Sequence, residues 1–355
     1  MKLRRIAGLL AIGLGGWIAV SYTSAYYDGP PSDHFDGSRF FNPQGSIGKG
    51  LLDVIQWRMK AETAKWPESV PLAKTAKPAK RVDGNALKVT FVGHATVLIQ
   101  TQGLNILTDP IWSDTAFMVS RRVTPPGIAF ADLPKIDIVL VTHSHYDHMD
   151  LTTLARLRRE HDPLVIAPLG NDEILLGEDD QMRVHTLDWW QSVAYNDRVR
   201  VHAVPVYHWS RRYPFDRNKA LWNGFVIETD GGAIYYAGDT GLWDGAFFKQ
   251  AKKRFGSFRF AILPVGAYEP RWFMQDQHVN PEEAVRIFQL LGAPPALGVH
   301  LRTFQLTDEA IDQPEIELAA ARRKKGITPG QFFTLPIGGA WSQSAAESAK
   351  PRGQP

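Results

Sequence analysis

Short apolar runs alternate with amphipathic segments through most of this chain. The runs are rich in β-branched and aromatic residues and are bounded by Gly, Pro, Asn or Asp, which is typical of buried strands. The pattern predicts strands at residues 88–92, 95–101, 104–108, 136–141, 164–167, 199–206, 233–237, 259–264 and 296–299. The segments between several of these strands carry apolar residues at helical spacing. They predict helices at residues 49–61, 151–160, 245–254, 281–291 and 314–325.

The helix at 281–291 has the clearest boundaries. Asn280 is a typical N-cap, Pro281 fits the first helical position, and Glu283 completes a capping box. Gly292 follows its end, as glycine often does after a helix. Because strands and helices interleave along the chain, the expected fold class is a layered α/β domain.

The first 27 residues read as a targeting segment. Lys2, Arg4 and Arg5 precede an uncharged apolar run at 6–20, which fits either a signal peptide or an uncleaved membrane anchor. In both cases the positive flank stays in the cytoplasm. We therefore expect membrane contact through this segment and a location in the bacterial cell envelope, periplasmic or anchored to the outer side of the cytoplasmic membrane.

Composition divides the rest of the chain. Residues 28–85 are rich in Pro, Gly, Lys and Ser and predict a linker that carries one helical extension, residues 86–341 form the predicted catalytic domain, and residues 342–355 read as a disordered polar tail. The formal net charge is only +3 and no basic stripe is visible, so no nucleic-acid partner is expected. The oligomeric state has no signal in the sequence.

The 355-residue chain contains no cysteine. Disulfides, cysteine nucleophiles and thiolate ligands are therefore excluded, and any bound metal must be held by nitrogen and oxygen donors.

Candidate chemistry concentrates directly after the apolar strand at 136–141. His143, His145, Asp147 and His148 stand within one short loop, and imidazole and carboxylate groups are what catalytic zinc uses. A tight turn can send alternate side chains toward two different ions. A polar loop that is rich in histidine by chance is the alternative interpretation.

Three further candidates also follow predicted strands: His208, Asp239 and His300. Taken singly, the histidines could cap strands and Asp239 could form a turn beside Gly238. If the strands share a direction, however, all of these groups gather at one edge of the domain and complete a metal site.

This pattern resembles the metallo-β-lactamase superfamily. The resemblance implies a four-layer αβ/βα sandwich and two Zn²⁺ ions per chain, with iron or manganese not excluded. It implies a metal-bridging hydroxide as the nucleophile. It also implies one ion held by His143, His145 and His208. The other ion would be held by Asp147, His148 and His300, with Asp239 bridging the two.

Within the superfamily the chain is similar to the N-acyl-phosphatidylethanolamine-hydrolysing phospholipase D family. That likeness rests on motifs at 40–43, 93–96, 107–110, 187–190, 266–274 and 278–284, and the run from Tyr268 to Met274 is its specific part. It implies a phosphodiesterase acting on a phospholipid or a related small phosphodiester, with Asp147 and His278 as catalytic residues. His278 would contact the phosphate or the leaving group.

Four other residues bear on this resemblance. Asp109 resembles a buried aspartate that orients the ligand loop, while His94 fits either such a role or that of a satisfied core histidine. Arg271 fits either a phosphate contact or an ordinary surface arginine. Arg302 stands where the family has a small residue and puts a cation near the metal edge, which leaves room for another function.

Two alternatives therefore stay open. One is a lactonase or other acyl or phosphoester hydrolase acting on a small soluble substrate, since one fold serves many reactions. The other is an envelope protein with a vestigial site, against which the complete set of ligands argues.

Overall fold

The computed structural model describes residues 26–45, 49–72, 76–116 and 120–348. The predicted leader therefore lies outside the described residues except for Tyr26 and Tyr27. Among the residues that are described, no helix combines the length and the apolar character needed to cross a membrane.

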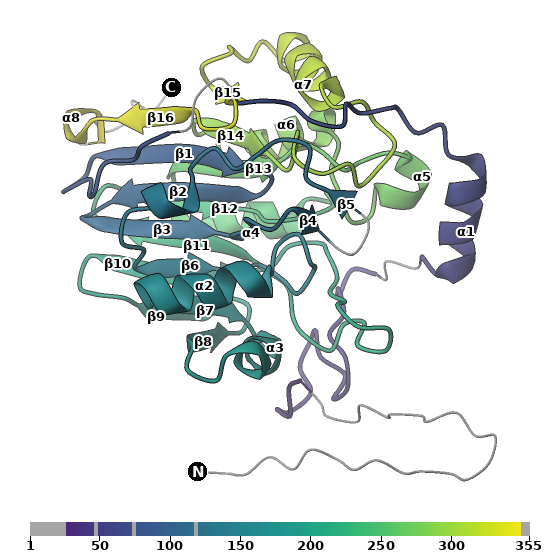
Figure 1. Ribbon diagram of the computed structural model, residues 1–355, viewed down its shortest axis with the longest axis horizontal. Coiled ribbons are helices and arrows are strands. Elements are labelled where there is room, and N and C mark those ends of the chain that lie inside the picture. The colour runs from purple at the N-terminus through teal and green to yellow at the C-terminus, as the bar shows by residue number, and fades with distance from the viewer. Residues whose placement is uncertain (1–25, 46–48, 73–75, 117–119, 349–355) are drawn as a thin grey trace.

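Two seven-stranded sheets face each other at the centre of the molecule (Figure 1). The first sheet contains, in spatial order, β16 (Ala340–Gln343), β1 (Leu87–Gly93), β2 (Thr96–Thr101), β3 (Leu104–Thr108), β6 (Ile138–Leu140), β7 (Leu164–Pro168) and β8 (Arg183–Leu187). The second contains β15 (Phe332–Phe333), β14 (Ala296–Val299), β13 (Phe258–Pro264), β12 (Ala233–Tyr236), β11 (Gly224–Thr229), β10 (Val199–Val204) and β9 (Ser192–Ala194). A small hairpin joins β4 (Thr115–Ala116) to β5 (Ser120–Arg121).

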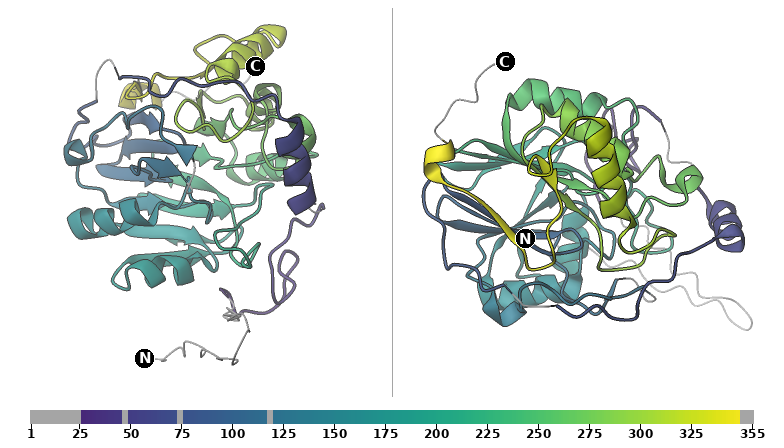
Figure 2. Two further views of the ribbon diagram at one scale, coloured as in Figure 1. Left: turned by 45° about the vertical axis from the view of Figure 1, so that its right-hand side comes forward. Right: turned by 90° about the horizontal axis from the view of Figure 1, so that it is seen from above.

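Helices cover the outer face of each sheet and complete four layers (Figure 2). The first sheet is covered by α2 (Leu151–His161) and α3 (Asn171–Glu178), and the second by α4 (Ala246–Phe255), α6 (Pro281–Leu290) and α7 (Gln313–Lys324). The shorter elements are η1 (Phe130–Asp132), α5 (Arg271–Met274) and α8 (Ala345–Ser348), while α1 (Leu51–Lys60) stands apart at the edge of the molecule. The αβ/βα arrangement is thus the one expected.

Alternation along the strands builds two apolar cores. In β2, Ile99 joins the core between the sheets, whereas the neighbouring Leu98 packs with Leu154 and Leu157 of α2. Successive strand residues point to opposite faces, so a central strand that is apolar on both faces can serve both layers.

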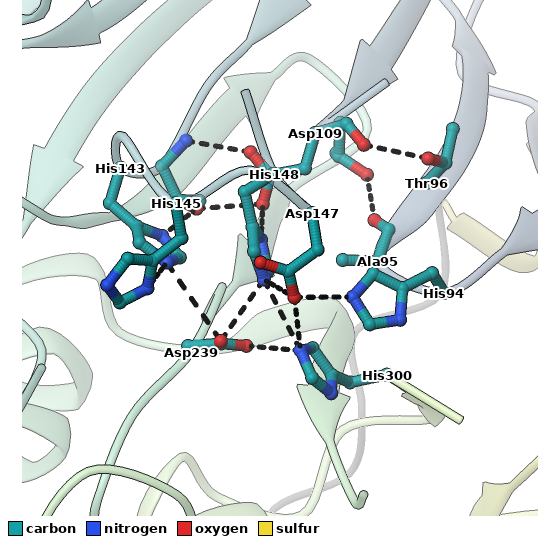
Figure 3. A network of polar contacts seen from close by, with 12 residues as sticks. His94, Ala95, Thr96, Asp109, His143, His145, Asp147, His148, Asp239 and His300 are labelled. Carbon is teal, nitrogen blue, oxygen red and sulfur yellow. Dashed lines mark hydrogen bonds and ion pairs between the residues drawn. The ribbon is translucent and has the colours of Figure 1, made fainter. Parts of the chain in front are cut away.

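Strand direction decides where the polar groups gather. β10 and β12 are both antiparallel to β11, and β12 to β14 are parallel, so β10, β12 and β14 run the same way. The segments after these three strands carry His208, Asp239 and His300 to one edge of the second sheet. The loop after β6 reaches the same edge from the first sheet (Figure 3).

The helix at Pro281 begins as its sequence predicted. The Asn280 side chain accepts from the amide of Glu283 at 2.9 Å, and the Glu283 carboxylate accepts from the amide of Asn280 at 3.1 Å. This capping box fixes the segment that immediately precedes the helix, which includes His278.

The segments before β1 pack against the domain, which corrects the linker expected within 28–85, while the helical extension expected there is present as α1. Phe35 and Phe40 are both 1% exposed and belong to the main core. Farther along, the amide of Val70 donates to the carbonyl of Val123 at 2.9 Å, so this stretch lies against the domain.

The disordered tail expected from Ser342 is wrong for its first residues. Ser342 pairs with Lys88 at the edge of the first sheet, and α8 follows directly. The sheet continues because β1 offers an edge to which another strand can pair. Residues 349–355, also assigned to the tail, lie outside the described part of the chain.

Candidate metal centre

The centre begins at the loop that follows β6. The chain turns tightly there, because the amides of His148 and Met149 both approach the carbonyl of His145, at 3.1 and 2.8 Å. The side chains of His143 and His145 point to one place (Figure 3). Those of Asp147 and His148 point to a neighbouring place, so one loop supplies two groups of donors.

Three imidazoles form the first donor group. The Nε2 atom of His143 lies 2.8 Å from Nδ1 of His145, and Nε2 of His208 lies 3.2 Å from the same His145 atom. His143 and His208 are buried, while His145 is partly exposed. The structure thus brings together the residues predicted for the first ion.

Asp147, His148 and His300 form the second donor group. The Nε2 atom of His148 lies 3.3 Å from both Asp147 Oδ2 and His300 Nε2. The distance between His300 Nε2 and Asp147 Oδ2 is 3.5 Å. These are the residues predicted for the second ion.

Asp239 lies between the two groups. Its Oδ2 atom is 3.1 Å from His148 Nε2, and its Oδ1 atom is 3.3 Å from His300 Nε2. On the other side, Oδ2 lies 4.0 Å from His143 Nε2 and 3.8 Å from His208 Nε2. A carboxylate in this place can contact an ion in either group, as predicted for a bridging ligand.

Asp109 supports side chains of both groups through hydrogen bonds but is not a donor in either group. It accepts from the amide and the hydroxyl of Thr142, at 2.8 and 2.7 Å, and from His148 Nδ1 at 2.7 Å. The Tyr236 hydroxyl donates to it at 2.5 Å. Because the Thr142 hydroxyl gives its proton to Asp109, it must accept from His143 Nδ1, which lies 2.9 Å away.

These hydrogen bonds show that a cation fits the site. The Nδ1 atoms of His143 and His148 carry protons, and so does Nδ1 of His208, which donates to the carbonyl of Gln277 at 3.0 Å. In a neutral imidazole the Nε2 atom then presents a lone pair. The lone pairs of His143 and His208 point into the centre, where a cation would satisfy them, whereas His148 would present its lone pair once a cation takes the place of its Nε2 proton. Nitrogen and oxygen donors in these numbers suit zinc and do not exclude iron or manganese.

The two groups differ in their electrostatics. Burial lowers the pKa of His148, but the surrounding carboxylates, above all Asp239, raise it well above its ordinary value. The same competition raises the pKa of His300 to about 9. In the first group burial prevails and lowers the pKa of His145 to about 4 and that of His208 to about 3. Without a bound cation, the histidines of the first group are therefore neutral. The second group instead combines two histidines whose pKa values are raised with the ionised carboxylate of Asp147.

The structure decides between the two roles considered for His94, support of a ligand or a satisfied core histidine, in favour of the first. Its Nε2 atom donates to Asp147 Oδ2 at 2.8 Å, and its ring centroid lies 4.0 Å from that of His300. Burial lowers the pKa of His94 to about 3, so the ring is a neutral donor. Burial raises the pKa of the Asp147 carboxyl, but the nearby histidines, chiefly His148, hold it well below its usual value. His94 thus orients an ionised candidate ligand.

His278 reaches the centre from the segment between α5 and α6. Its Nδ1 atom lies 3.8 Å from Asp239 Oδ2 and has no hydrogen-bond partner among the described residues. Arg271 donates to the carbonyl of His278 at 2.9 Å and pairs with Glu283 at 2.6 Å. Arg271 therefore positions this segment, and the phosphate contact considered for it from the sequence finds no support.

The cation expected beside the centre is also engaged. The guanidinium of Arg302 pairs with the carboxylate of Glu315, and the carbonyl of Arg302 accepts from the Thr124 hydroxyl at 2.7 Å. The charge of Arg302 is thus neutralised within the protein.

The backbone of the centre is strained in several places. His94, Asp109 and His300 have φ angles of 55°, 34° and 65°, a region that non-glycine residues rarely adopt. Each such residue costs roughly 1–3 kcal/mol and persists only where its surroundings determine it. Gly238 precedes Asp239 with φ of 61°, and a Cβ there would lie 2.6 Å from the Thr142 side chain. Only glycine allows Asp239 so close to the ligand loop.

Sequence reasoning missed three contributors. Thr142 and Tyr236 fix Asp109, yet Thr142 reads as an ordinary residue after a strand and Tyr236 as an ordinary strand residue. Trp209 packs its ring against His145, with centroids 4.6 Å apart. Its position directly after His208 was the one available signal, and that signal identifies proximity without revealing the contact.

Comparison with known proteins places this arrangement in a family. Residues 104–301, more than half of the chain, match the family model described as a β-lactamase superfamily domain. Together with the relatives below, this match shows that the chain belongs to the metallo-β-lactamase superfamily of metal-dependent hydrolases.

Individual relatives show which members of the superfamily this chain resembles. The chain is 33% identical over 274 residues to an N-acyl-phosphatidylethanolamine-hydrolysing phospholipase D of Caenorhabditis elegans, which covers 73% of this chain and 77% of the relative. It is 36% identical over 239 residues to the mitochondrial enzyme of that name from Saccharomyces cerevisiae, with 64% and 50% covered. An uncharacterised protein of Mycobacterium tuberculosis is 31% identical over 361 residues and covers 93% of this chain and 94% of its own.

Solved structures agree on the fold. An isothiocyanate hydrolase from Delia radicum gut bacteria has a TM-score of 0.59 at 19% identity, covering 72% of this chain and all of its own. A metallo hydrolase from the archaeon Ignicoccus hospitalis has a TM-score of 0.54 at 19% identity, covering 73% and 99%. At this identity the likeness concerns the fold alone.

Proposed function

We propose that this protein is a dinuclear zinc phosphodiesterase of the phospholipase D type. Its substrate would be N-acyl-phosphatidylethanolamine or a related phospholipid, cleaved on the head-group side to release a phosphatidic acid. The observation that carries the proposal is the convergence of two donor groups on either side of Asp239, with the unpartnered Nδ1 of His278 facing that carboxylate. The names of two of the relatives supply the substrate class.

The ligands would divide as the two donor groups do. His143, His145 and His208 would hold one ion, and Asp147, His148 and His300 the other, with Asp239 shared. When bound, two divalent cations acidify water and neutralise the charge that develops on phosphate oxygens.

The protein's own residues would position these ligands and the substrate. Asp109 and His94 hold ligating side chains in one orientation through buried hydrogen bonds. His278 has a ring nitrogen available to hydrogen-bond a substrate oxygen or the departing group, because no protein group occupies it among the described residues. Arg271 keeps that ring in place through the His278 carbonyl.

His278 is the sharpest test of this division of labour. His278→Ala should retain both metals and lose much of its turnover, because it removes a substrate contact and no ligand. Its metal content and its kcat should be measured together. Loss of an ion from the variant would make His278 a ligand, and unchanged turnover would remove it from the site.

A soluble acyl or phosphoester substrate is the competing function, and its main support in the sequence was a cation at Arg302. The pairing of Arg302 with Glu315 weakens that support. The deciding experiment offers metal-loaded protein three substrates: vesicles with labelled N-acyl-phosphatidylethanolamine, a soluble phosphodiester and a lactone. Release of phosphatidic acid well above that of an Asp147→Asn control supports the proposal. Efficient lactone opening with the lipid left intact would replace it.

We further propose that the leader places the domain outside the cytoplasm, periplasmic or held at the outer side of the membrane. The supporting feature is the positive flank of Lys2, Arg4 and Arg5 before the apolar run. A reporter that is active only outside the cytoplasm, fused to the C-terminus, should be active. Activity of a cytoplasm-only reporter alone would refute this orientation.

A further inference from the structure

Helix α1 exposes an apolar stripe. Leu51, Leu52 and Met59 are 77%, 80% and 81% exposed, and Ile55 is 46% exposed. At 3.6 residues per turn these four side chains fall within a stripe about 100° wide. Trp57, the buried residue of the helix, points in nearly the opposite direction. Exposed apolar side chains gathered on one face mark an interaction surface more often than scattered ones do.

The helix is fixed with its stripe facing outward. Trp57 Nε1 donates to the carboxylate of Asp308 at 2.6 Å, and its ring packs on Phe273 with centroids 4.9 Å apart. Just beyond the helix, Thr63 donates to the same carboxylate at 2.6 Å and the amide of Ala64 donates to the Asp308 carbonyl at 2.9 Å. Figures 1 and 2 show α1 at the periphery, away from both sheets.

Cations gather beside the start of α1. Arg217 donates to the carbonyl of Lys49 at 3.1 Å, and Arg39 donates to the carbonyl of Arg217. Burial lowers the pKa of Arg217, and the nearby charges of Arg211 and Arg39 lower it further. Arg58 adds a cation on α1 itself, where its guanidinium lies over the Trp57 ring, 4.8 Å from the centroid. A protein surface that holds like charges together is suited to an anionic partner.

Fewer acidic groups lie near these cations: Asp36 lies beside Arg39, and Asp216 in the loop at 209–217 is buried and accepts from the amides of Arg212 and Tyr213. Asp53 projects from the side of α1 away from the stripe, and its carboxylate accepts from the amide of Gly50 at 2.8 Å. Glu62 follows the end of the helix, whereas Arg217 contacts the segment before its start. The stripe is therefore bordered mainly by positive charge.

The loop at residues 209–217, which carries Arg211 and Arg217, connects these cations to the metal centre. Arg217 lies over the ring of Trp209, 4.4 Å from its centroid, and that ring packs on His145. Phe215 and Tyr213, farther along the loop, are 78% and 47% exposed. Apolar side chains, cations and the first donor group thus lie along one continuous part of the molecule.

We propose that the apolar stripe of α1 and the loop at 209–217 form a docking surface for an anionic phospholipid bilayer. Leu51, Leu52 and Met59 would enter the acyl region, while Arg39 and Arg211 would contact lipid phosphates. The surface goes beyond the proposed function, because it would bring the centre to a membrane whichever bond is cleaved there. It is also separate from the leader, since it belongs to the folded domain.

The absence of cysteine makes a direct test simple. Leu52→Cys is labelled with an environment-sensitive fluorophore in the full-length protein and mixed with vesicles that contain phosphatidylglycerol and a lipid-borne quencher. Ile316→Cys is the matched control, because Ile316 is 55% exposed on α7 and lies outside the proposed surface. We expect a blue-shifted emission and several-fold stronger quenching at 52 than at 316.

Other occupants of the stripe give different results. Equal quenching at both positions would overturn the proposal. A blue shift at position 52 that precedes vesicle addition and resists the lipid quencher would also overturn it, because the stripe would then be covered by protein, either a second copy or the leader. These readouts need no turnover, so they remain informative if the proposed enzymatic function fails.

The cations have a test of their own. The double substitution Arg39→Gln and Arg211→Gln should reduce quenching at 52 in phosphatidylglycerol vesicles to the level seen with phosphatidylcholine alone. The matched control substitutes two exposed cations at the end of α7, Arg323→Gln and Lys325→Gln, and should leave quenching unchanged. Quenching that is equally strong in both lipids before any substitution would contradict the role given to the cations.

Discussion

The two donor groups are held by different kinds of partner. In the first group, His143 and His208 are fixed by uncharged acceptors, the Thr142 hydroxyl and the Gln277 carbonyl. In the second, His148 is fixed by the Asp109 carboxylate, and Asp147 is itself the charged acceptor of a hydrogen bond. Hydrogen bonds to ionised groups are roughly twice as strong as neutral ones. The metal affinity of the second group should therefore fall more than that of the first when a single supporting side chain is removed.

The two groups nevertheless share one support. Asp109 acts directly on His148 and, through the Thr142 hydroxyl, on His143. One buried carboxylate thus sets the tautomer of a candidate ligand in each group. Substitutions can separate the direct contact from the relayed one.

The largest effect is expected from Asp147→Asn. This change removes the anionic donor of the second group, so kcat should fall by several orders of magnitude, on the scale known for essential catalytic groups. The measurement uses whichever phosphodiester the unmodified protein cleaves best, with thermal unfolding to check the fold. A fully metallated, active variant would show that Asp147 is not a ligand.

Asp109→Asn should weaken both groups. An amide replaces an oxygen with an NH₂ donor, so at least one hydrogen bond to Asp109 disappears, and affinity should fall about 10–100-fold for each ion. Competition with a chromophoric chelator measures this. Asp137→Asn at the opposite end of β6 is the matched control: it also disturbs a backbone contact, the amide of Asn105 at 2.8 Å, and should leave metal affinity unchanged. Loss confined to one ion would contradict the shared support.

His94→Ala should affect the second group alone. Asp147 loses the donor at 2.8 Å that orients it, so affinity for one ion should fall roughly 10-fold, at the low end for such supporting contacts. The same chelator titration resolves the two ions. His202→Ala is a suitable control, since His202 pairs with Glu228 away from the centre. An equal loss at both ions would place His94 in a different role.

Thr142→Val should give the complementary result with a smaller effect. The substitution removes the relay from Asp109 to His143 and keeps the side-chain shape, so the first ion should bind a few-fold more weakly. The hydrogen bond between the Thr142 hydroxyl and His143 joins uncharged groups, and such a bond is worth about 0.5–1.5 kcal/mol. Weakening of the second ion instead would reverse the assignment of Thr142.

The smallest effect lies outside both groups and concerns pH. Burial lowers the pKa of His34, but hydrogen bonds to Asp188 and Asp33 outweigh it and raise the pKa above 6.5. A group whose folded-state pKa is raised stabilises the fold fully below its unfolded pKa, and this contribution is lost as pH rises through the folded value. Thermal unfolding should therefore show stability declining above pH 6.5, and less so in His34→Gln. An identical pH dependence in both proteins would argue against the ion pair.

The candidate metal ligands could be predicted from the sequence because they follow directly after apolar strands. An apolar strand followed by four candidate ligands at 143–148 can be recognised without coordinates, as can the Asn280 cap. The sequence did not suffice for β8, an edge strand whose exposed alternate residues interrupt any apolar run. Nor did it reveal that residues 26–45 pack into the domain, because the turn-rich composition around Phe35 and Phe40 is that of a linker.

The supporting residues were harder to find for a general reason. Tyr236 and Thr142 act through contacts with Asp109 that join segments more than 30 residues apart in the chain. Such contacts depend on how the two sheets face each other, and that arrangement leaves no local pattern. Arg271 and Arg302 show the reverse: each looked available to a ligand in the sequence, and each is paired with a glutamate in the fold.

The most direct test of this account is the number of metal ions bound per chain. Elemental analysis of the purified full-length protein, set against its concentration, should give two ions, and Asp147→Asn should give one. Retention of a single ion by the variant would confirm that the two groups bind separately. If the unmodified protein, saturated with metal, binds only one ion per chain or none, the dinuclear centre is contradicted.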